Sequence, residues 1–236
     1  MLRPQHVEQK QPYVDDACKL LLHFNGQSGS QQFIDSSNNP KVVTAYGNTC
    51  LSNSHYRFGG TSGYFDGNGD YLSIVNSSDF NFRNGDFTIS MYAKTVAGSV
   101  GNHLFGQLTS DVTGGSVYGS ILNSNKYRGV VIIGGAGYPI DSTNTFTTTD
   151  WHHYALIRFG GTVYLYIDGI NEGTYSIGTN SIDTPTTNFI IGRAGDYTIS
   201  PLTGYIDEFM CFKGVAIPIG MLYPQKRPYG YPIGGT

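Results

Sequence analysis

Charged residues are scarce in this chain, and their scarcity narrows the range of possible partners. Only 13% of its 236 residues are charged, with 14 Lys and Arg against 17 Asp and Glu, which gives a net charge of −3. No basic cluster exceeds the pair Lys226–Arg227, so nothing in the chain would neutralise a phosphate backbone. No apolar run approaches the roughly 20 residues that a membrane helix needs. We therefore expect neither nucleic acid nor a membrane as a partner.

The N-terminal stretch lacks the apolar segment of a secretory signal peptide. It reads MLRPQHVEQKQPYVDD, with Gln, Pro and charged residues and little apolar periodicity. We interpret residues 1–18 as an extended arm, residues 19–224 as one folded domain and residues 225–236 as a Pro/Gly-rich tail. On this interpretation no conventional export signal would carry the chain out of a cell.

Cysteine is also rare, and its spacing does not suggest a metal site. Cys18, Cys50 and Cys211 are an odd number without metal-ligand spacing. The simplest interpretation is three reduced, buried side chains. One disulfide between two of them stays open as an alternative.

Glycine and aromatic residues are abundant instead, which is typical of a protein built from β-sheets. The chain has 32 Gly, 18 Tyr and 13 Phe, and turn residues separate short aromatic and β-branched runs. These runs predict strands at Lys19–Phe24, Val42–Ala45, Tyr64–Phe65, Tyr71–Val75, Phe87–Lys94, His103–Leu108, Val117–Leu122, Tyr127–Ile133, Trp151–Phe159, Thr162–Asp168, Phe189–Gly192 and Gly204–Phe212. No amphipathic helix lies between them, so we predict an antiparallel two-sheet sandwich.

Two tight hairpins are the strongest local signals. Gly160-Gly161 separates two alternating runs, and Asp168-Gly169 ends the second run. Both dipeptides suit turns whose central residues have positive φ. They predict three consecutive strands joined by short turns.

Several landmarks occur together and in order, and their order is more specific than any one of them. They are Leu20–Gly26 (LLLHFNG), Phe33–Ser37 (FIDSS), Phe58–Ile74, Ser77–Lys94, Asp150–Arg158 (DWHHYALIR), Tyr164–Gly169 (YLYIDG), Phe189–Arg193 (FIIGR) and Gly204–Ala216 (GYIDEFMCFKGVA). This series resembles the laminin-G-like jelly-roll domains of the concanavalin-A-like lectin/glucanase superfamily. The resemblance implies an all-β, antiparallel two-sheet jelly-roll sandwich. Such domains are common on bacteriophage tail and capsid proteins, bacterial surface proteins and glycosidases.

The residues that catalysis would need are missing from this pattern. Some members of the superfamily are glucanases that use two carboxylates on one face of a Glu-x-Asp-x-Glu strand. The chain has only three Glu and no such strand (Glu8, Glu172, Glu208). His152 and His153 are adjacent in a predicted strand, so they point to opposite faces and do not share a metal. We predict that the protein is not an enzyme.

One turn combines the groups that a hard cation prefers. Asp66-Gly67-Asn68-Gly69-Asp70 brings two carboxylates and an amide into one loop. The resemblance implies that Ca²⁺ sites lie at the rim of related sandwiches. We therefore consider Asp66, Asn68 and Asp70, with Asp207 as the partner from a late strand, as candidate Ca²⁺ ligands. The alternative is that these side chains only accept hydrogen bonds from turn amides.

Aromatic and polar loops offer a second kind of site. Tyr rings stack on pyranose faces, while Asn and Asp fix sugar hydroxyl groups. The loops Thr113–Tyr118, Gly134–Asp141 and Gly195–Ser200 are rich in these residues and are candidate sugar-binding loops. The alternative is that their Tyr residues belong to the core or to ordinary loops.

Two functions fit this sequence. The first is a phage virion component, such as a capsid decoration protein or a tail accessory, anchored to other virion proteins through residues 1–17 and located in the virion. By analogy such a protein would be a trimer. Phe209 and Met210 would add apolar surface for a partner. The alternative is an extracellular or cell-surface lectin module that recognises cell-surface polysaccharide, with or without Ca²⁺.

Overall fold

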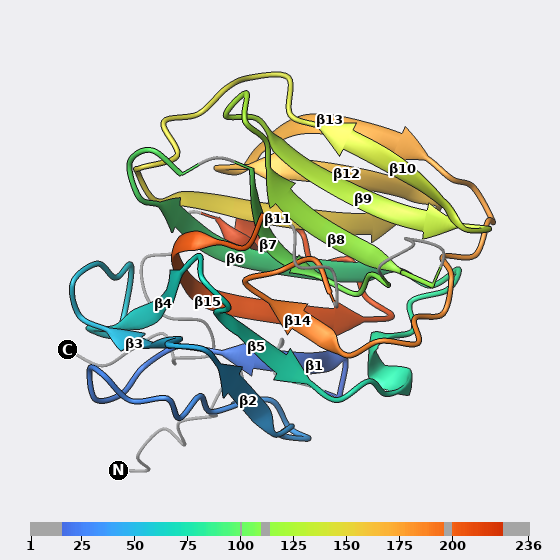
Figure 1. Ribbon diagram of the computed structural model, residues 1–236. Helices are drawn as coiled ribbons and strands as arrows, with labels where there is room; N and C mark the ends of the chain where they lie inside the picture. Colours follow the sequence, from blue (N-terminus) through green and yellow to red (C-terminus); the bar gives the residue numbers. More distant parts are fainter. Residues whose placement is uncertain (1–15, 100, 110–113, 196–199, 224–236) are drawn as a thin grey trace, which may run out of the picture.

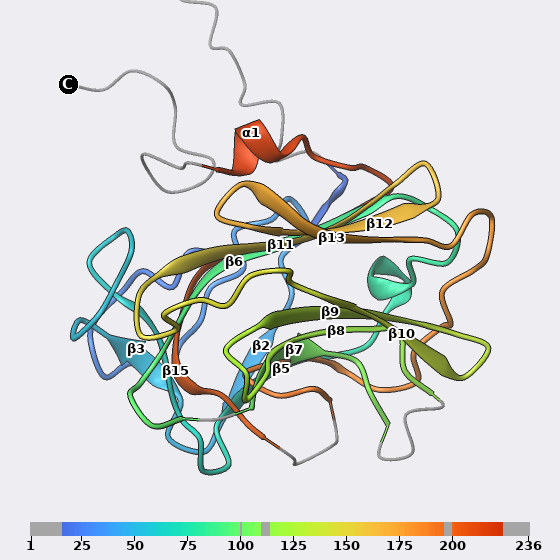
Figure 2. The same cartoon turned by 90° about the horizontal axis from the view of Figure 1, so that it is seen from above.

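A computed structural model describes residues 16–99, 101–109, 114–195 and 200–223. They form two antiparallel β-sheets that lie face to face (Figures 1 and 2), as the sequence predicts. The described residues also include one 3₁₀ turn, η1 (Ser78–Phe80), and one short helix, α1 (Ile219–Leu222). Neither approaches the length or apolar character of a membrane-spanning helix.

The larger sheet has eight strands and the smaller has seven. The larger contains β1 (Cys18–Leu22), β3 (Cys50–Ser52), β4 (Ser62–Asp66), β6 (Phe87–Thr95), β11 (His152–Phe159), β12 (Thr162–Ile167), β13 (Ile170–Ser176) and β15 (Thr203–Lys213). The smaller contains β2 (Val43–Tyr46), β5 (Tyr71–Ile74), β7 (Asn102–Gly106), β8 (Val117–Ile121), β9 (Tyr127–Ile133), β10 (Ala136–Asp141) and β14 (Phe189–Ile191).

The strand order places β15 at the centre of the larger sheet. That order is β13-β12-β11-β6-β15-β4-β3, and β1 also pairs with β15. The smaller sheet has the order β10-β9-β8-β7-β14-β5-β2. Strands that are distant in sequence are therefore neighbours, as a jelly-roll topology requires.

The core lies between the two sheets and follows from the alternation of each strand. In β6, Phe87, Ile89, Met91 and Ala93 point inward and are fully buried, because successive side chains of a strand point to opposite faces. Burial of one such large apolar side chain stabilises the fold by about 1.5–3 kcal/mol. A second group, called the outer cluster here, lies on the other face of the larger sheet under α1: Cys18, Leu21, Ala155, Ile157, Met210, Phe212, Ile217 and Leu222.

The two predicted hairpins are present. Gly160 and Gly161 have φ of 56° and 83° and join β11 to β12. Asp168 and Gly169 have φ of 51° and 78° and join β12 to β13. Two consecutive positive φ values match the right-handed twist of the flanking strands.

Several sequence predictions need correction. Cys18 is not part of an arm, because it is the first residue of β1 and pairs with Phe212. The segment predicted as the loop Gly134–Asp141 consists mostly of β10, an edge strand that tolerates Pro139. β3 was not predicted at all. Residues 1–15 and 224–236 lie outside the described residues.

A bulge in β15 changes the faces that the sequence alternation predicts. The pairing of β15 with β6 shifts register between Asp207 and Met210, and Glu208 has a φ of 51°. One extra residue in a strand reverses the alternation beyond it. Phe209 therefore lies in the core between the sheets and Met210 in the outer cluster, both at most 1% exposed. The prediction that they add apolar surface for a partner is wrong, because they are covered within the domain.

The Gly160-Gly161 turn gives a matched test of backbone geometry. A Cβ on Gly161 would lie 2.5 Å from the Gly178 carbonyl oxygen, whereas a Cβ on Gly160 would have no neighbour within 4 Å. We expect Gly161→Ala to lower the free energy of unfolding by about 1–3 kcal/mol. Gly160→Asn should change it little, because Asn tolerates positive φ. Urea unfolding checks both, and equal stability of the two variants would contradict the geometry.

Candidate functional site

The Asp66–Asp70 turn uses its carboxylates mainly on its own backbone. Asp70 is fully buried, and its two oxygens accept hydrogen bonds from the Asn48 and Asp66 amides. Asp66 accepts from the Asn68 amide at 2.7 Å. Burial raises the pKa of Asp70, and the two amide hydrogen bonds lower it. The turn thus has the bonding pattern of the alternative that needs no cation.

Asp207 does not lie beside this turn. Thr203 is the β15 residue opposite Asp66, and Asp207 lies four residues further along the strand. Its side chain accepts hydrogen bonds from the amides of Arg57, Phe58 and Glu208 at 2.8 to 2.9 Å. Burial raises the pKa of Asp207 to about 8.

The predicted Ca²⁺ ligands are therefore split into two places. Within the described ranges, no group of three or more His, Cys, Asp or Glu side chains could hold a metal ion. A Ca²⁺ ion bound by Asp66, Asn68 and Asp70 stays a prediction, without Asp207 as a ligand.

The two adjacent histidines face in different directions, as expected for strand neighbours. His152 bonds Asp168 through Nδ1 at 2.6 Å and contacts Phe146. His153 is buried on the other face, where Nε2 lies 2.7 Å from the Ser90 hydroxyl. Burial lowers the pKa of His153 to about 3, so its ring is neutral at pH 7. Both histidines hold neighbouring strands together.

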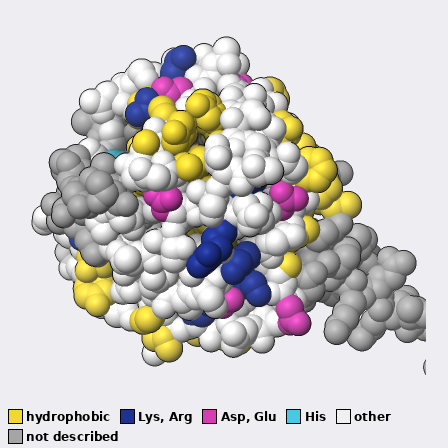
Figure 3. Space-filling model, turned by 90° about the vertical axis from the view of Figure 1, so that its right-hand side faces the viewer, with side chains coloured by type: hydrophobic (Ala, Val, Ile, Leu, Met, Phe, Trp, Pro, Cys, Tyr) yellow, Lys and Arg dark blue, Asp and Glu magenta, His cyan; other side chains and the backbone are white. Residues whose placement is uncertain are grey.

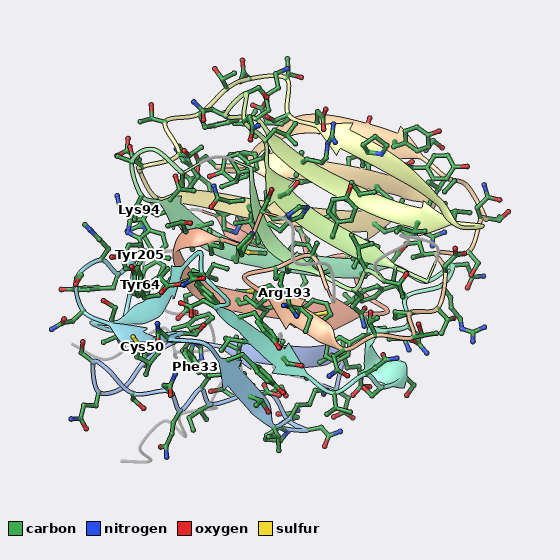
Figure 4. All side chains as sticks on the ribbon, in the orientation of Figure 1. Phe33, Cys50, Tyr64, Lys94, Arg193 and Tyr205 are labelled. Carbon is green, nitrogen blue, oxygen red and sulfur yellow. The ribbon has the colours of Figure 1, made fainter. Side chains whose placement is uncertain are left out.

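A row of four side chains crosses the outer face of the larger sheet. Cys50, Tyr64, Tyr205 and Lys94 occupy directly paired positions on β3, β4, β15 and β6. Their chain neighbours Phe65, Ile206 and Ala93 point into the core, so the row faces outward. Figure 4 shows the four residues in a column along one edge of the molecule. We call them the tyrosine row.

Aromatic contacts fix the centre of the row. The Tyr64 and Tyr205 rings lie 5.1 Å apart, and the exposed His55 ring meets Tyr205 edge-on at 4.9 Å. Tyr205 is 7% exposed and supports Tyr64, which is half-buried. Burial, and secondarily the nearby carboxylates of Asp66 and Asp70, raises the pKa of Tyr64. Its phenol therefore stays protonated and can donate a hydrogen bond as well as accept one.

A polar pocket at the rim continues from the end of the row. It has a volume of about 480 Å³ and is lined by residues 96–99, Asn125 and 145–149. Phe146 supplies an aromatic ring, and four threonines supply hydroxyl groups. Lys94 donates a hydrogen bond to the carbonyl of Thr149, which is also a lining residue. The row and the pocket therefore meet at Thr149.

Sequence reasoning placed the sugar-binding candidates in loops and missed this row. In the three candidate loops, residue 113 and residues 196–199 lie outside the described residues, and residues 136–141 form β10. Tyr64 and Tyr205 lay within predicted strands. The alternation of each strand indicates that both side chains point outward. Only the pairing of β4 with β15 makes the two tyrosines neighbours.

A basic cluster lies on another side of the molecule. Figure 3 shows Lys and Arg side chains gathered near the middle of one side face, with acidic side chains beside them. Around η1, Lys19 and Lys41 pair with Asp79 at 3.8 and 3.0 Å, and Lys213 donates to the Ser78 carbonyl at 2.6 Å. Each of these lysines forms an ion pair or a hydrogen bond with η1, and we infer that together they hold η1 in place.

Comparisons with known proteins identify the fold. Residues 66–216 match the family described as the concanavalin A-like lectin/glucanases superfamily. No curated protein matches the chain.

Solved structures with the same fold include the binding domain of Paraclostridial Mosquitocidal Protein 1, with 14% identity, a TM-score of 0.65 and coverage of 88% of this chain and 51% of that one. The receptor binding domain of botulinum neurotoxin D has 15% identity, a TM-score of 0.66 and coverage of 89% and 52%. The binding domain of botulinum neurotoxin DC in complex with SialylT has 14% identity, a TM-score of 0.61 and coverage of 88% and 50%. The chain thus spans about half the length of these domains.

The lowered pKa of His153 predicts how stability depends on pH. The unfolded chain binds the proton near a pKa of about 6.5, but the folded protein binds it only near 3. Between these values the unfolded state holds more protons, so stability falls as the pH falls, by up to about 1.4 kcal/mol per pH unit. We expect His153→Gln to remove this part of the slope in urea unfolding from pH 7 to 4.

The exposed His55→Gln variant is the histidine control for this experiment. A pH slope that is the same in both variants would contradict the role assigned to His153.

Proposed function

The chain belongs to the concanavalin A-like lectin/glucanases superfamily, and we propose that it is a non-catalytic module that binds cell-surface polysaccharide through the tyrosine row and the adjoining rim pocket. The observation that carries this proposal is the outward Tyr64–Tyr205 pair with His55 at its edge. The solved structures of the same fold are named as binding domains. These names support a binding role without identifying a ligand.

The chemistry of the row suits a sugar ring. The C–H face of a pyranose stacks on an aromatic ring, and its hydroxyl groups need donors and acceptors around that ring. Tyr64 offers the ring, while its own hydroxyl, His55 and Lys94 offer polar partners. The threonine hydroxyls of the rim pocket would extend these contacts to further sugar units.

The positions of the carboxylates support a role without catalysis. A glycosidase needs two carboxyl groups that flank the scissile bond and reach the substrate. Asp207 and Glu208 are fully buried, and Glu172 is 4% exposed and accepts hydrogen bonds from Asn144. None of these three carboxylates reaches the tyrosine row at the surface.

Removal of the Tyr64 ring tests the proposed site. On an array of bacterial polysaccharides, the wild-type protein should bind a subset of glycans, and Tyr64→Ala should weaken that binding about tenfold or more, equivalent to about 1.4 kcal/mol. Tyr175→Ala is the matched control, because Tyr175 is another strand tyrosine, exposed on β13 and outside the row. Equal losses in the two variants would refute the site, and no binding by the wild-type protein would refute the function.

The same array, run with a calcium chelator, tests whether Ca²⁺ at the Asp66–Asp70 turn contributes to glycan binding. Asp66 is the last residue of β4, two residues after Tyr64, and Asn68 follows in the turn, so a Ca²⁺ ion there would order the end of the row. A chelator should then weaken binding by the wild-type protein but not by an Asp66→Asn variant.

Display on a virion is the second function that we propose. The supporting observation is that Ala17 and Leu222, near the two ends of the described chain, both pack in the outer cluster. Both ends of the described chain therefore lie on one face of the sandwich. Attachment to capsid or tail proteins through residues 1–17 would leave the tyrosine row at the opposite end of that face free for glycans.

Deletion of residues 1–15 tests this display. Ala17 stays, because its carbonyl accepts a hydrogen bond from the Lys213 amide. We expect the truncated chain to keep its glycan binding and fold but to be missing from purified phage particles analysed by mass spectrometry. Incorporation at wild-type copy number, or absence of the full chain from particles, would refute the anchoring role.

A further inference from the structure

A second aromatic group lies on the outer face of the smaller sheet. Tyr46 on β2 and Tyr71 on β5 are directly paired, and their rings are parallel within 3° at 4.5 Å. The guanidinium carbon of Arg193, which follows β14, lies 3.7 Å from the centre of the Tyr71 ring. Figure 4 places Arg193 beside β14. We call these three residues the Arg193 stack.

Gly192 brings Arg193 to this position. It has a φ of 89°, and a Cβ there would lie 2.5 Å from the Phe65 ring in the core. Only glycine fits both this conformation and this close approach. The chain can therefore turn sharply after β14 and carry Arg193 to Tyr71.

The distances decide the order of the stack. Two parallel rings 4.5 Å apart leave no room for a guanidinium between them, so Arg193 and Tyr46 must lie on opposite faces of Tyr71. Tyr46 is 44% exposed. It lies on β2, the edge strand of the smaller sheet, so no strand covers its far side.

Arg193 has unused hydrogen-bonding capacity. Within the described part of the chain it has no acidic partner, and its Nε is buried without a hydrogen bond. Stacking occupies the flat face of a guanidinium and leaves the in-plane N–H groups of its two terminal nitrogens for a carboxylate, which Arg binds with two parallel hydrogen bonds.

We propose that the Arg193 stack is a second binding site, specific for an acidic oligosaccharide. A carboxylate on one sugar unit pairs with Arg193, and another unit stacks on the exposed face of Tyr46. Because Tyr71 lies between these two contacts, the ligand must be longer than one sugar unit. Thr44, exposed two residues before Tyr46 on the same strand face, supplies a hydroxyl for the sugar.

This inference rests on the proposed function only for the class of ligand, since the two sites lie on different sheets. The inference and the proposed function can fail independently of each other, because the tyrosine row and the Arg193 stack share no residue.

Isothermal titration with acidic and neutral probes tests the second site. The probes are tetragalacturonate, which carries a carboxylate on every unit, its methyl ester, and sialyllactose against lactose. We expect the wild-type protein to bind one acidic probe, and the better of the two shows whether a chain of acidic units or one terminal acid is recognised. Arg193→Gln should weaken that binding at least tenfold, and Arg193→Lys, which keeps the charge but loses the planar donor pair, should weaken it less.

Tyr46→Ala and Tyr64→Ala complete the design. Tyr46→Ala should weaken binding of the acidic probe, while Tyr64→Ala should leave it unchanged. The inference is overturned if no acidic probe binds, if the methyl ester binds as well as the acid, or if Tyr64→Ala alone removes the binding. That last result would leave the proposed function standing and assign the acidic ligand to the tyrosine row.

Discussion

The bulge at Asp207 and Glu208 in β15 is the constraint on which the larger sheet depends. β15 pairs with β6 along one edge and with two strands, β4 and β1, along the other. Its two carboxylates lie at the junction between these two strands. Asp207 accepts the amides of Arg57 and Phe58 in the loop before β4, and Glu208 bonds His23 after β1 at 3.0 Å. The bulge therefore joins two loops that no backbone pairing connects.

Because this junction is buried, disrupting it would lower the free energy of unfolding. Both carboxylates are fully buried, and a buried polar group that loses its partner costs about 1–3 kcal/mol, more when it is charged. The hydrogen bonds to the three amides and to His23 compensate for that burial. The same bonds withdraw both carboxylates from the surface, so one arrangement stabilises the sandwich and keeps these two groups away from solvent.

The fold could be predicted from the sequence because strand alternation and turn residues are local signals. Gly160-Gly161 and Asp168-Gly169 specify their hairpins without reference to the rest of the chain. The tyrosine row could not be predicted in this way, because Tyr64 and Tyr205 become neighbours only through the jelly-roll pairing of β4 with β15. Asp207 was assigned to the wrong surroundings for a related reason. The turn at Asp66 meets β15 at Thr203, and no local pattern gives that register.

The bulge also explains why the tyrosine row lies where it does. Beyond the bulge, the outer face of the larger sheet carries the outer cluster, in which residues of α1 pack with Met210 and Phe212. Before the bulge, the face carries Tyr205, paired with Tyr64 and Lys94. Because the extra residue resets the alternation, Ile206 and Phe209 both point into the core although they are three residues apart. One strand thus supplies a covered half, where both ends of the described chain pack, and an open half with aromatic and polar side chains. A ligand bound at the open half, as we propose, would leave the packing at either end of the described chain unchanged.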